Sequence, residues 1–285
     1  MDPKASRTAL HTAQHRAAHL LLDSDPKILS DTFARAFAGF DTDTDLLSAL
    51  DAMAPVEFPR MRALFTLRHR YAEDELARAL AHGITQYIIL GAGLDSFAFR
   101  RPDLAGSLRV FEVDHPATQE WKRARVAGLG ITPPTNLTYV PIDFEHDALR
   151  GRLLSSGVNA SKAVFASWLG VAQYLTPEAI GATLRDIAAF AAVGSKLVVQ
   201  FIVPPETLAP DEAALVAALA ARAQQFGEPW RSYFLPAEFE RYLREVGFGS
   251  ISHFGSEQAS SRYLRNRSDG LRLPAYFHMI TAGIP

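Results

Sequence analysis

The segment from Gln86 to Ser96, QYIILGAGLDS, constrains the fold more than any other part of the sequence. It begins with an apolar, partly β-branched run that is typical of a strand buried on both faces of a sheet. Gly91 and Gly93 follow at once, and two glycines so close together permit a sharp turn and let a ligand approach the main chain. The segment therefore predicts the first strand and glycine loop of a nucleotide-binding α/β domain.

The next expected strand, 108–114, ends in an acid that suits the same interpretation. Asp114 lies 23 residues after Gly91, close to the spacing of about 20 expected for a carboxylate that accepts hydrogen bonds from both ribose hydroxyls. Ser96 stands where the dinucleotide fingerprint carries its third glycine, which makes a nicotinamide cofactor less favoured. The alternative interpretation is a tight turn, with Asp114 as an ordinary acid at a strand end.

Strand-like and helix-like segments alternate along the chain and predict a parallel, doubly wound sheet with its site at the carboxyl ends of the strands. Further strands are expected at 136–144, 163–168, 195–202, 251–254 and 276–282. Helices are expected over 4–40, in a short segment ending at Met53, and over 60–82, 116–126, 211–226 and 236–246, with helical starts at His146 and Thr176 and a break bounded by Pro55 and Pro59.

We expect one domain over residues 1–285. It would comprise an N-terminal helical extension (1–60), a cofactor-binding core (61–203), a helical insertion that forms a lid over the strand ends (204–235), and the C-terminal part of the sheet (236–285).

Composition excludes several classes of protein. Hydrophobic residues make up 48% of the 285, enough for a large core, and the net charge of −2 favours neither nucleic acid nor an anionic membrane as partner. The absence of cysteine excludes disulfides, thiolate zinc sites and cysteine nucleophiles. The start is unlike a signal peptide, and no apolar run approaches the roughly 20 residues needed to span a bilayer, so a cytoplasmic location is expected.

Three polar groups outside the glycine loop are candidates for ligand binding. The expected helix 60–82 carries several arginines, which either form surface ion pairs or supply one guanidinium to a ligand carboxylate. Asp143 followed by Phe144 suits an adenine amino group and its ring; Asp143 is otherwise a cap for the next helix, and we favour the ligand. His11, His15 and His19 share one helix face, more typical of a polar face than of a metal site, and no metal is expected.

These residues, taken with others in the same order, resemble the leucine carboxyl methyltransferase family. The resemblance is to its broad bacterial branch of S-adenosyl-L-methionine-dependent methyltransferases, which includes polyketide O-methyltransferases. It runs nearly end to end. The segments that carry it are Ser6-Arg7-Thr8-Ala9 with Arg16-Ala17, Arg68-His69-Arg70 with Glu73-Asp74, LGAGLD (90–95) with Phe99-Arg100, FEVDHP (111–116) with Lys122, Asp143-Phe144, and WLGVAQYLTPE (168–178).

The resemblance implies a class I methyltransferase fold, which is a Rossmann-like, seven-stranded, mostly parallel sheet, and S-adenosyl-L-methionine as cofactor. It implies that Arg68, with Arg70 as the nearby alternative, pairs with the methionine carboxylate. The other implied cofactor residues are Gly91, Ala92, Gly93, Asp114, Asp143, Phe144 and Trp168. Leu169 stands where many members carry a glutamate, so backbone carbonyls near Ser167 and Trp168 would replace that contact.

The expected reaction is methyl transfer to the oxygen of a small-molecule carboxylate or hydroxyl. A carboxylate needs no base; a hydroxyl does, and His115, His253 and His278 are weak candidates, so no catalytic residue is assigned. Tyr174, Trp168 and the insertion are candidates for the acceptor pocket. The rival hypotheses are an NAD(P)-dependent oxidoreductase on a similar sheet, which Ser96 and Asp143-Phe144 disfavour, and a non-catalytic cofactor-binding protein.

Overall fold

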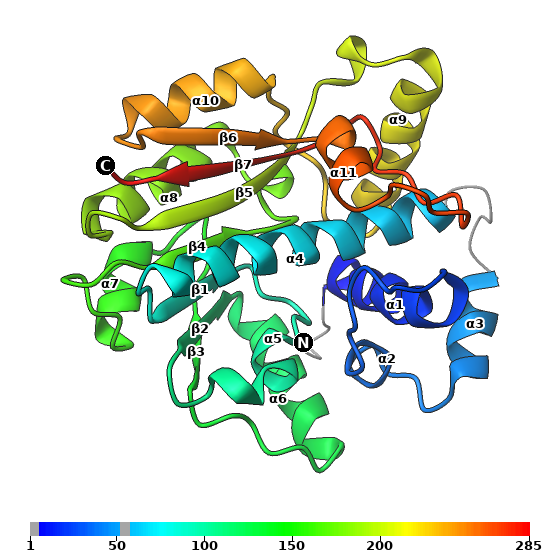
Figure 1. Ribbon diagram of the computed structural model, residues 1–285, viewed down its shortest axis with the longest axis horizontal. Helices are drawn as coiled ribbons and strands as arrows, with labels where there is room; N and C mark the ends of the chain where they lie inside the picture. The colour runs from blue at the N-terminus through cyan, green and yellow to red at the C-terminus, as the bar shows by residue number, and fades with distance from the viewer. Residues whose placement is uncertain (1–5, 52–57) are drawn as a thin grey trace.

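A seven-stranded sheet forms the centre of the computed structural model, which describes residues 6–51 and 58–285 (Figure 1). The strand order is β3-β2-β1-β4-β5-β7-β6. The strands are β1 (Gln86–Leu90), β2 (Arg109–Asp114), β3 (Leu137–Pro141), β4 (Phe165–Trp168), β5 (Lys196–Ile202), β6 (Ser250–Phe254) and β7 (Phe277–Gly283).

Strands β1 to β5 are parallel, and β7 runs antiparallel between β5 and β6. Every residue of β1 is buried, because the strand lies in the middle of the sheet with helices on both faces. The predicted class I methyltransferase fold, with its seven-stranded, mostly parallel sheet, is confirmed.

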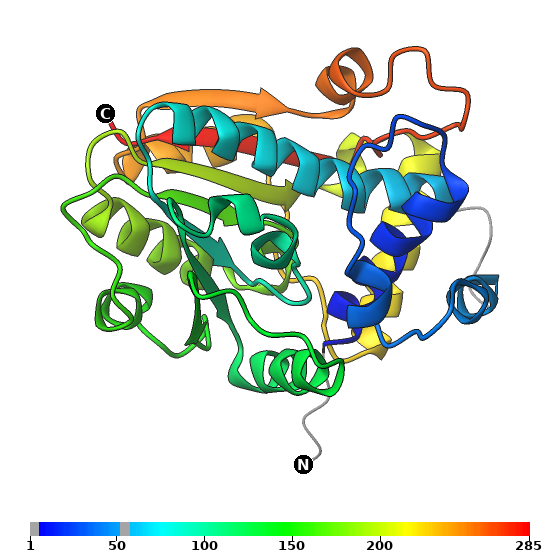
Figure 2. The same ribbon diagram turned by 60° about the horizontal axis from the view of Figure 1, so that its bottom comes forward.

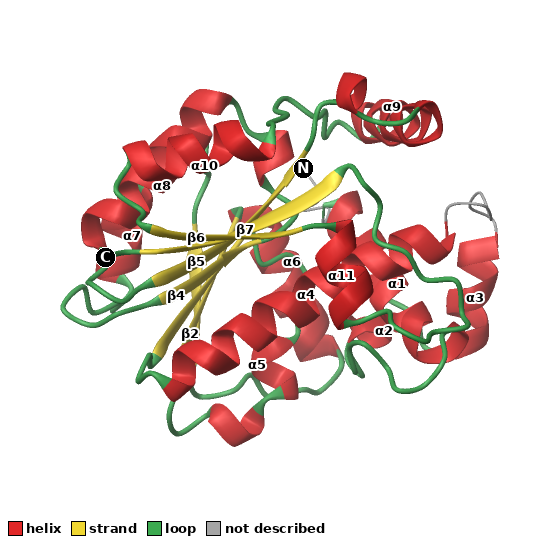
Figure 3. Cartoon of the chain, turned by 45° about the horizontal axis from the view of Figure 1, so that its top comes forward, coloured by secondary structure: helices red, strands yellow, loops and turns green. Residues whose placement is uncertain are grey.

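Helices cover both faces of this sheet (Figure 3). The long α4 and the short α5 lie on one face, and α7, α8 and α10 lie on the other (Figure 3). The helices are α1 (Arg7–Leu22), α2 (Ala34–Phe37), α3 (Asp43–Asp51), α4 (Phe58–Ala81), α5 (Phe97–Arg100), α6 (Pro116–Gly128), α7 (Leu149–Ser155), α8 (Pro177–Phe190), α9 (Pro210–Gln225), α10 (Pro236–Glu245) and α11 (Ser256–Arg262), with 3-10 turns at Pro102–Leu104 (η2), Ala172–Tyr174 (η3) and Pro205–Thr207 (η4).

Helices α1 and α9 lie beyond the carboxyl ends of the parallel strands (Figures 1 and 2). One comes from the N-terminal part of the chain and the other from the segment after β5, so two distant stretches of sequence cover the edge where the site is expected. Within the described ranges, every helix is too short or too polar to traverse a lipid bilayer.

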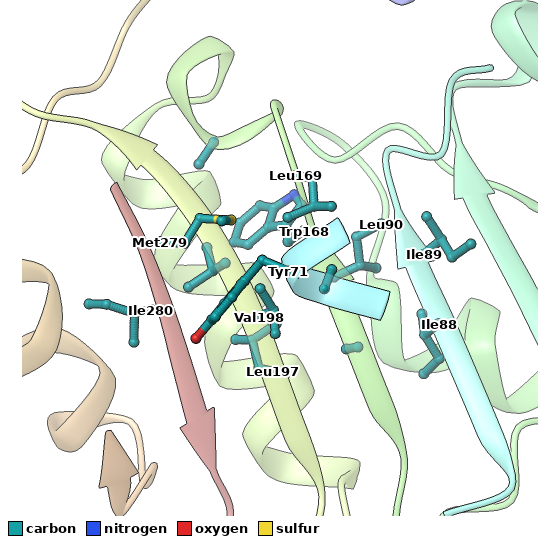
Figure 4. Close-up of a cluster of buried hydrophobic side chains, with 14 of the residues drawn as sticks. Tyr71, Ile88, Ile89, Leu90, Trp168, Leu169, Leu197, Val198, Met279 and Ile280 are labelled. Atoms are coloured by element: carbon teal, nitrogen blue, oxygen red, sulfur yellow. The ribbon is translucent and has the colours of Figure 1, made fainter. Parts of the chain in front are cut away.

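The main hydrophobic core fills both faces of the sheet, with α4 on one face and α7, α8 and α10 on the other. Tyr71 of α4 packs over the central strands near Trp168 and Leu169 (Figure 4). Its hydroxyl reaches Thr281 of β7 at 2.7 Å, and its ring stacks on Phe254 of β6 at a centroid distance of 4.1 Å. Because it contacts β7 and β6, Tyr71 helps to fix this antiparallel pair against the parallel part of the sheet.

The helices expected over the first sixty residues needed correction. Residues 23–33 are not helical: Asp31 bonds to Arg16 at 2.8 Å and the amide of Ile28 donates to Nε2 of His19, which holds this segment as a loop. Pro59 does not bound a break but sits in the first turn of α4, where proline is tolerated because the first amide groups have no intrahelical partner. Helix α11 was not predicted, and Met53 and Pro55 lie outside the described residues.

Candidate active site

A cavity of about 710 Å³ opens at the carboxyl edge of the parallel strands. Its wall is built from the ends of β1, β2, β3 and β4, the N-terminal part of α1, and the loop after α9. A volume of several hundred Å³ is the usual size of a small-molecule or cofactor site.

The glycine loop after β1 forms the floor of this cavity. Gly91 and Gly93 have φ values of +67° and +50°, in the left-handed region that favours glycine. A Cβ atom on Gly91 would overlap the side chain of Val171, and one on Gly93 would lie 3.2 Å from Cβ of Ala9. The two glycines are therefore needed both for the turn and for the close approach of neighbouring elements.

Asp114 lines the cavity where β2 ends, beside the glycine loop. Its carboxylate accepts hydrogen bonds from the amide of Gly93 and, at 2.6 Å, from that of His115. Burial raises the pKa of Asp114, and the two amide bonds partly offset that rise. These bonds fix the carboxylate in the cavity wall.

Asp143 and Phe144 follow β3 and line the same side of the cavity. The Asp143 carboxylate accepts a hydrogen bond of 3.0 Å from the amide of Glu145, within its own turn. Helix α7 begins later and has Ala148 at its N-cap, so Asp143 does not cap that helix.

A buried arginine lines the opposite side of the glycine loop. Arg68 of α4 is 7% exposed, its Nε atom has no hydrogen-bond partner, and Nη2 reaches only the hydroxyl of Thr12 at 3.4 Å. No Asp or Glu in the described residues forms an ion pair with it. Burial lowers the pKa of Arg68 to about 9, with a further contribution from Arg16. A guanidinium in this condition favours an incoming anion.

The alternative arginine is engaged elsewhere. Arg70 bonds to Asp74 at 2.9 Å and to the carbonyl of Ile28 at 3.1 Å, and it does not line the cavity. Of the two, Arg68 is the one that faces a potential ligand.

Beneath the loop that follows β1, a buried lysine ties this loop to β2. Lys122 donates to the carbonyl of Asp95 at 2.6 Å and to the Glu112 carboxylate at 2.5 Å. Burial raises the pKa of Glu112 to about 7, although Lys122 acts in the opposite direction. This pair supports the loop from behind and takes no place in the cavity lining.

Of the residues predicted to bind ligands in the segment that begins at the end of β4, the structure places only some in the cavity lining. Leu169 and Tyr174 line the cavity, but Trp168 is fully buried in the core and does not (Figure 4). The Trp168 ring lies 6.2 Å from that of Phe144, so it supports a lining residue from behind. The hydroxyl of Tyr174 lies close to Thr8, and burial raises its pKa.

Sequence reasoning missed Gly170 and the cavity-lining part of α1. Gly170 has a φ of +73°, and a Cβ atom there would overlap the guanidinium of Arg68. From α1 and its cap, the residues that line the cavity are Ser6, Thr8, Ala9, Thr12 and Arg16. The sequence carried one signal for the α1 residues, the family similarity around Ser6 to Ala9, but that similarity predicted only a helix.

The histidines considered as bases are not gathered around the cavity. His115 lines it but is exposed and accepts a hydrogen bond from the amide of Ala117 as the N-cap of α6. His253 and His278 bond to each other at 2.9 Å, and His253 bonds to Glu240 at 2.7 Å; none of these three lines the cavity.

The histidines of α1 have separate contacts. His11 and His15 approach each other at 3.1 Å, whereas His19 bonds to Asp23 at 2.7 Å. Among the described residues, no three His, Asp or Glu side chains are placed to share a metal ion.

Comparison with known proteins identifies the family. The family model described as leucine carboxyl methyltransferase matches residues 9–188. The chain belongs to the leucine carboxyl methyltransferase family. The resemblance expected from the motifs is thereby confirmed.

Relatives in this family carry a consistent description. YktD of Bacillus subtilis, named as a candidate S-adenosyl-L-methionine-dependent methyltransferase, is 35% identical over 215 residues, which cover 75% of this chain and 70% of YktD. A Mycolicibacterium smegmatis protein with the same kind of name is 32% identical over 249 residues, covering 84% and 79% of the two chains.

Solved structures support the fold. A crystal structure of a candidate methyltransferase from Thermobifida fusca superposes with a TM-score of 0.58 at 19% identity, covering 99% of this chain and 96% of that one. A DUF574 family protein from Streptomyces avermitilis superposes with a TM-score of 0.61 at 18% identity, covering 89% and 95%.

Proposed function

We propose that this leucine carboxyl methyltransferase family member transfers a methyl group from S-adenosyl-L-methionine to an oxygen of a small molecule. The observation that carries the proposal is Arg68, a buried guanidinium without a carboxylate partner among the described residues, in a cavity whose other side presents Asp114. One ligand that combines an α-carboxylate with a ribose diol satisfies both groups.

The order of strands supports this placement. β1 lies between β2 and β4, so residues after β2 and β3 lie on one side of the glycine loop and Arg68 with Gly170 lies on the other. On this basis Asp143 and Phe144 would contact adenine, Asp114 would hold the ribose hydroxyls, and Arg68 would pair with the methionine carboxylate. Gly91, Ala92 and Gly93 would lie beneath the ligand.

When bound, the cofactor supplies an electrophilic methyl group on a sulfonium. The chain's own contribution is to hold the acceptor oxygen in line with that methyl group, and positioning of this kind is worth several kcal/mol. The loop at 227–231 and the start of α1 line the outer part of the cavity, where they would exclude water from the reacting atoms. The segment 204–235 would thus act as the lid.

Calorimetry with two ligands tests the cofactor. S-adenosylhomocysteine should bind at micromolar affinity and NAD should not; tight NAD binding would favour the oxidoreductase hypothesis. An Arg68→Met variant should lose at least about tenfold in affinity for S-adenosylhomocysteine, because a charge-assisted bond contributes about 1.5–3 kcal/mol.

The same variant offers an internal control. Methylthioadenosine has the nucleoside but no carboxylate, so Arg68→Met should leave its affinity unchanged within about twofold. An equal loss for both ligands would show that Arg68 supports the fold of the cavity rather than the carboxylate. Turnover with labelled methyl donor and a panel of small acceptors separates an enzyme from a non-catalytic binding protein.

A further inference from the structure

A second, smaller chamber of about 80 Å³ adjoins the main cavity. Thr8, Arg68 and Tyr174 line both spaces and so form the boundary between them. The remaining walls come from α1, α4, α9, the residues before β7, and the end of β5. At 10–15 Å³ for each water, the chamber has room for about five to eight water molecules, which corresponds to a single ring or a short chain.

The position of the chamber follows from the strand order. Along the edge of the sheet, β3 and β2 carry the residues assigned to the nucleoside, β1 carries the loop, and β4 leads into Gly170 beside Arg68. The next strand is β5, and the chamber lies there. It therefore adjoins the methionine side of the main cavity, where the reacting methyl group would lie.

A buried polar residue, Gln200, lies among the residues that line this chamber. It lies on β5, two residues before Ile202 on the same face, and is 1% exposed. Its Oε1 atom has no hydrogen-bond partner. A buried amide oxygen without a partner costs free energy, so a ligand that donates a hydrogen bond there gains affinity.

The charges that line the chamber have one sign. The described lining residues include Arg7, Arg68 and Arg222 and no Asp or Glu. His11 also lines it, and burial together with Arg222 lowers its pKa to about 4, which leaves a neutral imidazole of low basicity. Such a lining suits an acceptor that arrives as an anion and offers little to deprotonate a hydroxyl.

We propose that this chamber is the methyl-acceptor subsite and that it takes a compact, mainly apolar carboxylic acid with a hydrogen-bond donor at the end remote from its carboxylate. The inference rests on the proposed function. A lone pair of the carboxylate oxygen forms the new bond to the methyl carbon as the carbon–sulfur bond breaks. The products are a neutral methyl ester and a neutral thioether, and no proton is transferred.

Three probes test the ligand chemistry on the full chain saturated with S-adenosylhomocysteine. Ligand-observed NMR should show 4-hydroxybenzoate binding at least about tenfold more tightly than benzoate, because only the former donates to Gln200. The uncharged 4-hydroxybenzyl alcohol should not bind. With S-adenosyl-L-methionine, liquid chromatography coupled to mass spectrometry, which separates the two isomers of equal mass, should detect the methyl ester of 4-hydroxybenzoate and not its methyl ether.

Two pairs of variants locate the binding. Ala223→Phe fills the chamber and should abolish binding of the acids, whereas Ala218→Phe, on the exposed face of the same helix, should not. Gln200→Leu should erase the preference for 4-hydroxybenzoate over benzoate, whereas Gln224→Leu at an exposed position should keep it. All four should bind S-adenosylhomocysteine as the wild type does.

The outcomes separate this inference from the proposed function. Loss of S-adenosylhomocysteine binding in the wild-type chain would overturn the function itself. With that binding intact, the inference is overturned if no acid binds the wild type, if Ala223→Phe binds the acids equally well, or if the ether is the product. A leucine-terminated peptide that is methylated equally by wild type and Ala223→Phe would also overturn it.

Discussion

Asp114 is the single residue whose replacement most directly tests the nucleoside side of the cavity. The amides of Gly93 and His115 donate to different oxygens of Asp114, so Asp114→Asn keeps an acceptor for one of them and removes the charge offered to a ribose diol. We expect the affinity for S-adenosylhomocysteine, measured by calorimetry, to fall about 10- to 100-fold. Asp103→Asn, at an exposed position, is the matched control; equal affinities in the two variants would contradict the assignment.

Gly170 makes a second prediction for a single residue. In Gly170→Ala the new Cβ atom would displace the Arg68 guanidinium, and the left-handed backbone would be strained by about 1 kcal/mol. We expect lower stability in urea unfolding and a loss of at least about tenfold in S-adenosylhomocysteine affinity.

Gly83→Ala is the control for Gly170→Ala. Gly83 has a similar positive φ of +89°, but nothing lies within 4 Å of its hypothetical Cβ atom. It should show the loss of stability without the loss of affinity. If both variants bind equally well, Gly170 does not position Arg68.

At the scale of elements, a buried ionic network fastens α1 to the glycine loop. Arg16 donates to Asp31 at 2.8 Å and to the carbonyl of Leu94 at 2.7 Å, and Ser96 donates to Asp31 at 2.6 Å. Since α1 supplies part of the cavity wall, the network couples the N-terminal segment to the site.

Removing one charge from that network should be costly. Asp31→Asn leaves the buried Arg16 without its partner, and we expect the free energy of unfolding to fall by about 3 kcal/mol in urea denaturation. Asp25→Asn in the same loop is the control, because Asp25 is exposed and lies 3.9 Å from Lys27. A change within about 0.5 kcal/mol for Asp31→Asn would contradict this account.

How far each element could be predicted depended on where its contacts come from. β1 and the loop after it carry their own signal in a continuous apolar run followed by Gly91 and Gly93, and they were predicted correctly. The loop at 23–33 was predicted as helix, because its bonds are made to residues distant in sequence, such as Ser96. Gly170 was missed for a similar reason: the approach of Arg68, which comes from a distant part of the sequence, adds to the positive φ in requiring glycine there.

For the whole molecule, the order of the strands sets the order in which the proposed binding positions follow one another along one edge of the sheet. Residues after β3 and β2 face the proposed nucleoside, α4 brings Arg68 beside the segment after β4, and the chamber follows at β5. Helix α1 precedes all the strands in the sequence and α9 follows β5, yet both helices line the chamber. The cofactor in the main cavity and the acceptor in the chamber would therefore lie next to each other. Thr8, Arg68 and Tyr174 are the residues that line both spaces.

Acid should destabilise the whole molecule through histidines whose pKa is lowered in the fold, and the half-buried His278 offers a test outside the site. Burial and the neighbouring His253 lower its pKa to about 4, whereas the unfolded chain protonates near 6.5. The unfolded state thus binds more protons as pH falls from about 6.5 to 4, and the stability that neutral His278 contributes is lost across that window. Between pH 7 and pH 5, the free energy of unfolding in urea should fall by about 1 kcal/mol less for His278→Gln than for the wild type. His82→Gln, at an exposed position, is the control and should behave like the wild type. Parallel pH profiles for all three would show that His278 does not titrate differently in the folded state.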